Sequence, residues 1–408
     1  MVSRVGVGVL SMVVSCTPCF ADASDEVRSI VAEMLADAGT RSSLVGSGAS
    51  VTHEGGFLLS ADSGETLRVG GIVQFRYFRG LGADDDEGGF QNRRSRLDFR
   101  GTLASPDFSY RLRWDFSPST GRAALLDVFV QHAFAEGWSW RAGQFTVPFD
   151  REFFTAPSQL LLIDRSIVSS VFRVNRSQGV MLAYRGDRLR AYGTIDDGRA
   201  GLNTDFLGAN VADIGLTGRL EFRLGDAPWS QYASQSGRPG DATGAMLGVA
   251  GHYQHEGQTG APADVDGEVD LYLYTADVSV EGDGWSVIAA LAGRDFEGER
   301  GSAHDIGAFA HAGRFVTDDV EVYGRYAHVF PGERDAGGDA DFGQATLGCN
   351  WYPLSGSTAL RLSAEVTYFT RSASSFASIL RTPDTTLGLL PDDDGGQLSV
   401  ALQAQIRF

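Results

Sequence analysis

The chain has 408 residues, of which 43% are hydrophobic and 21% are charged, and its formal net charge is −18. Its mean hydropathy is slightly negative, and no segment approaches the 18 or more apolar residues of a membrane-spanning helix, so a helical membrane protein is excluded. All 34 basic residues are arginine, and 52 residues are acidic. A large β-barrel is compatible with these values, because lipid-facing and lumen-facing residues alternate along its strands and average out near neutral.

The first 23 residues have the form of a secretory signal peptide. Arg4 precedes an apolar run over residues 5–14, and the small residues Ala21 and Ala23 mark a cleavage site. The apolar run is too short to cross a bilayer as a helix, which takes about 20 residues. An alternative interpretation is a lipoprotein signal, in which Cys16 becomes a lipidated N-terminus.

Cleavage after Ala23 leaves Cys349 as the sole cysteine of the mature chain, which excludes an internal disulfide and a cysteine-based metal site. Residues 24–64 then form a periplasmic N-terminal segment ahead of the barrel. Within it, residues 25–38 carry apolar side chains at helical spacing, which predicts a short helix. The helix either self-associates or is a tether, because two heptads make only a marginal coiled coil.

Residues 65–408 alternate apolar and polar side chains over segments of about ten residues, as the strands of membrane barrels do. Residues 214–224 give the clearest example, and residues 108–116 and 360–368 repeat it. The charged polar faces, the long segments and the aromatic residues toward their ends favour a membrane barrel over a soluble sandwich. We count about sixteen segments. The prediction is an all-β fold, a transmembrane antiparallel barrel of about 16 strands.

The predicted connections alternate between short and long. Ser105-Pro106-Asp107 and Gly186-Asp187 are expected to be tight periplasmic turns. Long polar loops rich in Gly and Asp are expected on the outer face, and they span residues 82–91, 258–267, 332–340 and 372–396.

The last strand carries the most specific signal. Leu402, Ala404, Ile406 and Phe408 form an apolar face that ends on a terminal aromatic residue, opposite a polar face with Arg407. A terminal Phe on a clean alternating strand, in a chain with a signal peptide, resembles the signal read by the machinery that folds outer-membrane proteins. We therefore expect the chain to be an outer-membrane protein in contact with outer-membrane lipid.

Enzyme motifs are absent from the sequence: there is no Gly-rich phosphate loop before a helix, no H-E-x-x-H and no G-x-S-x-G elbow. The seven His are scattered and form no ligand set. The acidic runs at residues 84–87 and 392–394 are compatible with Ca²⁺ binding, but solvated loops explain them better. We expect no enzymatic activity, no metal, no cofactor and no nucleic-acid partner.

Charge is divided unevenly along the chain. Residues 91–225 carry 18 arginines against 14 acids, and residues 226–408 carry 10 against 26. Most arginines of the first part lie on the polar faces of predicted strands, which look into the lumen of a barrel. Rows of arginine in a narrow pore attract anions, because the low-dielectric wall reduces screening. Pairing with wall carboxylates such as Asp98, Asp115, Asp127 and Glu221 is the structural alternative.

Three motifs carry a family resemblance. They are Asn-Arg-Arg-Ser-Arg-Leu-Asp-Phe-Arg-Gly at residues 92–101, Gly-Gln-Phe-Thr-Val-Pro-Phe at residues 143–149 and Asn-Arg-Ser-Gln-Gly-Val at residues 175–180. They resemble the arginine-rich strand, a strand end and a strand start of the phosphate-selective porin O and P family. The similarity covers most of residues 55–408.

The resemblance implies a sixteen-stranded, usually trimeric barrel whose third loop folds inward and narrows the pore. Here that loop spans residues 150–174, and its apolar stretch 160–163 is expected to pack against the wall. Its length also suggests a functional loop. The candidate pore and anion-binding residues are Arg94, Arg96, Arg100, Arg111, Arg113, Arg151, Arg165, Arg173, Arg176, Arg219 and Arg223.

The sequence thus predicts a porin that forms a water-filled channel for passive diffusion of small solutes and favours anions such as phosphate. Phosphate specificity in the family relies partly on pore lysines, and this sequence has none. Two alternatives remain: a general or cation-tolerant porin, suggested by the acidic second half, and a structural or adhesive envelope barrel without channel activity.

Overall fold

The computed structural model describes residues 50–408 apart from residues 54–55, 83–85, 207, 209–210, 258–268, 299–300, 333–340, 373–378, 380–383, 385 and 392–395. The predicted signal peptide, Cys16 and the predicted helix at residues 25–38 lie outside the described residues. Among the described residues, none of the helices is long and apolar enough to cross a membrane.

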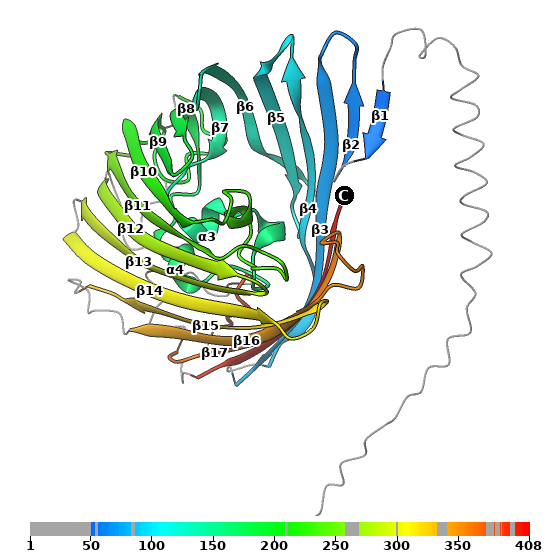
Figure 1. Cartoon of the computed structure of the whole chain (residues 1–408). Coiled ribbons are helices and arrows are strands. Elements are labelled where there is room, and N and C mark those ends of the chain that lie inside the picture. The colour runs from blue at the N-terminus through cyan, green and yellow to red at the C-terminus, as the bar shows by residue number, and fades with distance from the viewer. Residues whose placement is uncertain are drawn as a thin grey trace, which may run out of the picture. The chain divides into compact units, whose positions relative to one another are not determined.

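Sixteen strands form a closed antiparallel barrel (Figure 1), which confirms the predicted fold. Each strand pairs with its neighbours along the chain, and the last strand closes the ring by pairing with β3, from Leu398 opposite Leu81 to Arg407 opposite Ile72. The strands are β3 (Thr66–Leu81), β4 (Gly88–Leu103), β5 (Ser105–Phe116), β6 (Ala123–Ala135), β7 (Trp138–Thr146), β8 (Arg176–Arg185), β9 (Leu189–Asp196), β10 (Ile214–Gly225), β11 (Gly244–His255), β12 (Val269–Gly282), β13 (Trp285–Gly298), β14 (Gly301–Phe315), β15 (Val320–Phe330), β16 (Phe342–Trp351), β17 (Leu360–Phe369) and β18 (Leu398–Arg407).

Alternation along the strands divides the wall into an apolar outside and a polar inside, as the sequence predicts. In β10, Leu220 is 52% exposed on the outer face, whereas Arg219 and Glu221 are buried inside the barrel. In β18, Leu402 and Ile406 face outward while Gln403 and Gln405 are buried. The exposed apolar face suits lipid, and the polar face requires partners within the lumen.

The turns agree with the predictions, with two corrections. The first expected turn, at Ser105, is wrong by one residue, because the chain reverses at Ala104 with φ +56° and β5 already begins at Ser105. The loop expected over residues 82–91 is shorter, because β4 begins at Gly88. Parts of the other long loops lie outside the described residues.

Two short strands precede the barrel proper. β2 (Phe57–Ser60) pairs with Thr66–Val69 of β3, and β1 (Ser50–His53) pairs with β2. β2 occupies the edge of β3 that β18 also uses: Phe57 lies opposite Val69, and the backbone of Phe408 bonds to Gly71 in both directions. β2 and β18 therefore lie end to end along one edge of β3.

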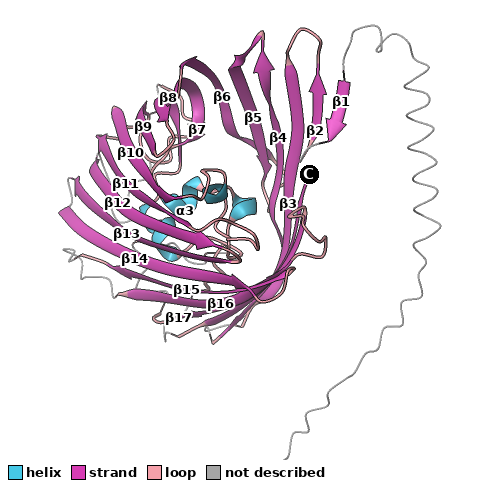
Figure 2. Cartoon of the chain, in the orientation of Figure 1, coloured by secondary structure: helices cyan, strands magenta, loops and turns pink. Residues whose placement is uncertain are grey.

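The loop between β7 and β8 folds into the barrel, as predicted (Figure 2). It contains the helical turn α3 (Arg151–Phe154), the 3-10 turn η1 (Pro157–Gln159) and the helix α4 (Ile167–Phe172). Unusual backbone angles occur in the last part of β7 and directly before β8. Gly143 has φ +128°, and a Cβ there would lie 2.2 Å from the Val128 carbonyl oxygen, while Asn175 has φ +78°.

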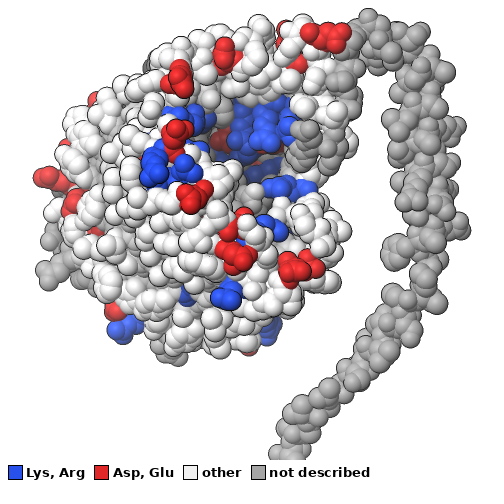
Figure 3. All heavy atoms as spheres, viewed as in Figure 1, with Lys and Arg blue, Asp and Glu red and all other residues white. Residues whose placement is uncertain are grey.

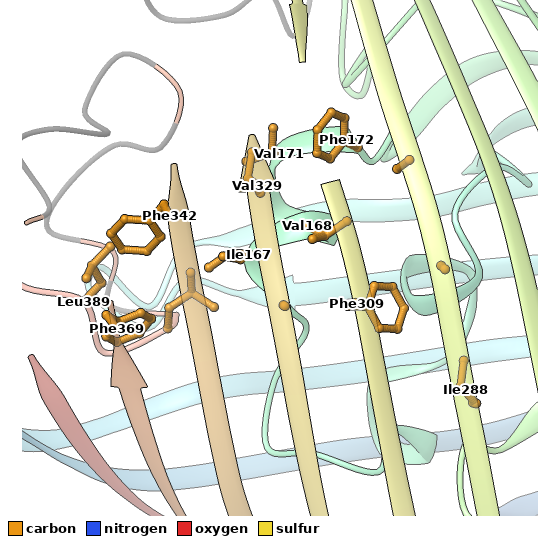
Figure 4. Close-up of a cluster of buried hydrophobic side chains, with 14 residues drawn as sticks. Ile167, Val168, Val171, Phe172, Ile288, Phe309, Val329, Phe342, Phe369 and Leu389 are labelled. Atoms are coloured by element: carbon orange, nitrogen blue, oxygen red, sulfur yellow. The ribbon is translucent and has the colours of Figure 1, made fainter. Parts of the chain in front are cut away.

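Apolar side chains seat this inner loop against the wall. Ile167, Val168 and Phe172 of α4 pack against the inner faces of β13–β15 and against Phe342 and Phe369 (Figure 4). The predicted packing of residues 160–163 is also observed, because all four side chains are at most 2% exposed.

A second connection enters the lumen from the opposite end. Residues 226–243, between β10 and β11, include η2 (Gln231–Ala233) and meet the inner loop, where Gln235 N–H donates to Gln159 O at 2.9 Å. This inward course was not predicted, because short turns were expected at that rim.

Candidate functional site

Arginines gather where the inner loop faces the wall formed by β4–β8. Figure 3 looks into the barrel opening and shows them around the hollow. A cavity of about 520 Å³ lies there, lined by ten arginines and two aspartates. A second cavity of about 440 Å³ shares Arg96, Arg100, Arg111 and Arg113 with the first and extends to Arg68 and Arg407. Together they form an arginine-lined passage with twelve arginines and three aspartates on its walls.

A β-bulge in β4 explains why two consecutive arginines line this passage. Gln74 pairs with Arg94 and Phe75 pairs with Asn92, so Arg93 has no partner on β3. A bulge breaks the alternation of faces, and both Arg93 and Arg94 therefore line the cavity. A second bulge between Arg113 and Trp114 leaves Leu126 unpaired on β6, and Leu126 and Asp127 likewise both face the cavity.

Asp164 fixes the inner loop to this arginine wall. Its carboxylate accepts from Arg76 Nη2 at 3.0 Å, from Arg93 Nε at 2.9 Å and from Arg94 Nη2 at 2.9 Å. Burial raises the pKa of this carboxyl, but the charges of Arg93, Arg94 and Arg76 lower it by more, and the pKa lies well below its usual range. One carboxylate thus faces three guanidinium groups, so positive charge remains in excess.

Arg165, the next residue, is held by backbone carbonyls. It donates to the carbonyl oxygens of Glu152, Phe153 and Thr155 at 2.9 to 3.3 Å. Carbonyl oxygens orient the guanidinium without neutralising it. The ring of Phe153 adds a second support, because the guanidinium carbons of Arg165, Arg173 and Arg176 lie 4.6, 5.3 and 5.8 Å from its centroid.

Further down the passage, arginines and aspartates alternate. Asp98 accepts from Arg111 at 2.6 Å and from Arg113 at 3.1 Å. Arg113 and Arg176 share Asp127, and Arg96 pairs with Asp115. For these arginines, the structural alternative of pairing with wall carboxylates is therefore observed. In contrast, Arg100 and Arg173 have no carboxylate within ion-pair distance among the described residues.

Residues 69–233 match the model of a family described as phosphate-selective porin O and P. In sequence, this segment is similar to that porin family. It includes the two bulges, Asp164 and most of the arginine-lined passage.

Solved structures share the fold of the porin at low identity. An anion-selective porin from Comamonas acidovorans is 15% identical with a TM-score of 0.58, and the alignment covers 84% of this chain and 100% of that chain. OmpT of Vibrio cholerae is 11% identical with a TM-score of 0.57 over 86% and 100%. The outer membrane channel DcaP of Acinetobacter baumannii is 13% identical with a TM-score of 0.54 over 86% and 99%. No curated protein matches in sequence.

The family match and the closed barrel support an outer-membrane channel. Eight of the eleven predicted site residues line the larger cavity of this channel. They are Arg94, Arg96, Arg100, Arg111, Arg113, Arg165, Arg173 and Arg176.

Three predicted residues lie elsewhere in the porin. Arg151 is buried and bonds to Ser279 Oγ, Thr155 Oγ1 and the carbonyl of Tyr232. Arg219 is buried between Glu221 and Asp277, at 2.9 and 2.8 Å. Arg223 donates to the carbonyls of Asp187 and Ala227 at the rim. None of the three lines either cavity. Each side chain is instead bonded to the barrel wall, to the inner loop or to a turn.

Four of the arginines that line the passage were not among the predicted site residues. Arg93 lies on the wrong face for strict alternation, and only a bulge brings it inside. Arg141 is on the inner face of β7, where it contacts Gln131 and lies 4.0 Å from the centroid of Phe129. Arg68 and Arg407 line the smaller cavity. The alternation of β18 already placed Arg407 on the polar face, so the sequence held a signal for that residue.

Proposed function

We propose that this porin is a passive, water-filled channel that favours small anions, phosphate among them. The observation that supports the proposal is the imbalance on the walls of the arginine-lined passage, where twelve arginines face three aspartates. A low-dielectric wall focuses this charge on the aqueous path, so anions are concentrated and cations repelled.

Two arginines are best placed to meet a passing solute. Arg100 is exposed and Arg173 is half-buried, and neither is bound in an ion pair with a described carboxylate. A guanidinium group offers a planar fork to phosphate or carboxylate oxygens. The arginines that are held in ion pairs strengthen the positive electrostatic field of the passage, but they do not offer free N–H donors.

A planar bilayer tests the anion preference. Purified porin in a KCl gradient should give stepwise conductance with a reversal potential displaced toward that of chloride. Arg100→Glu and Arg173→Glu should each reduce the displacement, while Arg79→Glu, on the outer face, should not. A reversal potential displaced toward potassium would support the cation-tolerant alternative. Absence of conductance would support the envelope-barrel alternative.

Phosphate is the finer part of the proposal. The family description names phosphate-selective porins, and an arginine ladder supplies bidentate donors in place of lysines. Single-channel currents in potassium chloride and in potassium phosphate of equal activity measure it. Block of the chloride current by millimolar phosphate supports selectivity for phosphate, and unaltered chloride current limits the proposal to a general anion preference.

We further propose a homotrimer that reaches the outer membrane through cleavage after Ala23 and assembles through its last strand. OmpT, which shares the fold, has been described in a trimer form. The outward face of β18 ends at Phe408, as an assembly signal would. Chemical cross-linking in isolated membranes tests the trimer, and removal of Phe408 should lower the amount of heat-modifiable barrel in those membranes. N-terminal sequencing of the mature chain distinguishes cleavage after Ala23 from lipidation at Cys16.

A further inference from the structure

We propose that the larger cavity binds organic carboxylates, in which a carboxylate group is joined to an apolar or aromatic body, in preference to small inorganic anions. The inference rests on the proposed anion channel and specifies which anions it retains longest. The observation behind it is that the walls of this cavity are not only cationic. Leu126, Phe129, Phe153, Phe154 and Leu202 also line it.

The exposure of the two loop phenylalanines is imposed by the wall contacts of α3. Asp150 caps this turn by accepting from Glu152 N–H and Phe153 N–H. Glu152 pairs with Arg325 of β15 at 3.2 Å, and Arg151 bonds to Ser279 of β12 at 3.1 Å. Since both preceding side chains are bound to that wall, the next two residues point to the opposite side.

Phe153 and Phe154 both line the cavity on that side, and both remain half-buried. Phe154 is partly covered, because its ring meets Tyr192 edge-on at 5.8 Å. Phe153 packs mainly against guanidinium groups. Apolar surface left in contact with water is unfavourable in proportion to its area. A ligand with an apolar body would remove that cost.

The chemistry of such a ligand follows from the two kinds of wall. Its carboxylate would meet the fork of Arg100 or Arg173, which lack carboxylate partners among the described residues. Its apolar body would meet Phe153, Phe129 and Leu202. A volume of about 520 Å³ exceeds what a bare phosphate or chloride fills, and guanidinium faces also stack on aromatic rings.

Block of the chloride current at pH 7.5 tests the proposal, with benzoate and acetate as probes that share one charged group. We expect benzoate to reach half-block at a concentration about tenfold below that of acetate, in line with the contacts of one aromatic ring. Equal half-blocking concentrations would overturn the proposal. A KCl-gradient reversal potential recorded on the same membranes separates this outcome from failure of the anion channel itself.

Two variants locate the effect. Phe153→Ala should lower the benzoate preference over acetate about fivefold, and Phe153→Leu should retain most of it. Phe222→Ala, a lipid-facing control on β10, should leave the preference unchanged. If Phe153→Ala weakens block by both probes equally, Phe153 merely positions arginines and the proposal fails. If that variant yields no channels, the comparison of probes on the unaltered porin still decides.

Discussion

The lumen has two unlike walls. The wall of β3–β8 presents arginines to an open cavity, whereas the wall of β12–β17 is covered by the inner loop. Its acids serve as acceptors for the loop and the turns: Glu365 accepts from Ile163 N–H at 2.9 Å, and Glu321 accepts from Ser236 Oγ and Asn350 Nδ2. Both of these acids are buried beneath the loop and the turns, at 8% and 1% exposed, and neither lines the arginine-lined passage. Ion selectivity depends on which charged side chains line the aqueous path. The net charge of the chain does not indicate which ones these are.

The largest effect is expected at the border of the covered wall, where Arg219 of β10 pairs with Asp277 of β12. Arg219→Met leaves Glu221 and Asp277 buried without their partner, which should destabilise the barrel by about 3 to 5 kcal/mol. Urea unfolding followed by the mobility of unheated protein in gels measures the loss. Because Arg219 faces neither cavity, anion preference in the folded fraction should stay constant, and a changed reversal potential would contradict the division between the two walls.

The second-largest effect is expected where Asp164 attaches the inner loop to the arginine-bearing wall. Asp164→Ala removes the carboxylate shared by Arg76, Arg93 and Arg94, which should weaken loop attachment by about 3 kcal/mol. We expect higher and noisier single-channel conductance than in the unaltered porin. Asp86→Ala, which removes the exposed partner of Arg79, is the matched control. Conductance identical to that control would show that other contacts hold the loop.

A smaller effect is expected on the open side. Arg100→Gln removes one unpaired charge from the passage without breaking an ion pair among the described residues. Stability should change by less than about 0.5 kcal/mol, while the reversal potential in a KCl gradient should move toward zero. If stability falls and the reversal potential stays, Arg100 belongs with the structural arginines.

The smallest effect is expected outside the barrel. Arg79→Gln breaks the pair with Asp86 at 3.5 Å, where both side chains are more than 40% exposed. Exposed pairs contribute about 0 to 1 kcal/mol, so thermal stability, conductance and selectivity should all match the unaltered porin. A measurable loss of anion preference would mean that charge at the outer rim, and not only in the lumen, steers solutes.

Much of this division was predictable from the sequence. Strict alternation identified the strand count, the polar face of β10 and the outward Leu402 and Ile406. Lumen-facing arginine and structural arginine share the same pattern, however, so Arg219 and Arg100 were indistinguishable before their neighbours were known. The bulge at Arg93 and the inward course of residues 226–243 were also hidden, because both depend on pairing between segments distant in sequence and not on local periodicity.

The short strand β2 has a consequence for how the ring closes. β18 ends opposite Gly71, and β2 starts opposite Val69, so a single residue of β3 separates the two strands on their common edge. A two-residue slip of β18 toward Thr66 would place Phe408 where Phe57 already lies. Strand registers that keep the same face inward differ by two residues. β2 therefore occupies the backbone positions of β3 that the nearest same-face slip of β18 in that direction would need, and so disfavours that register.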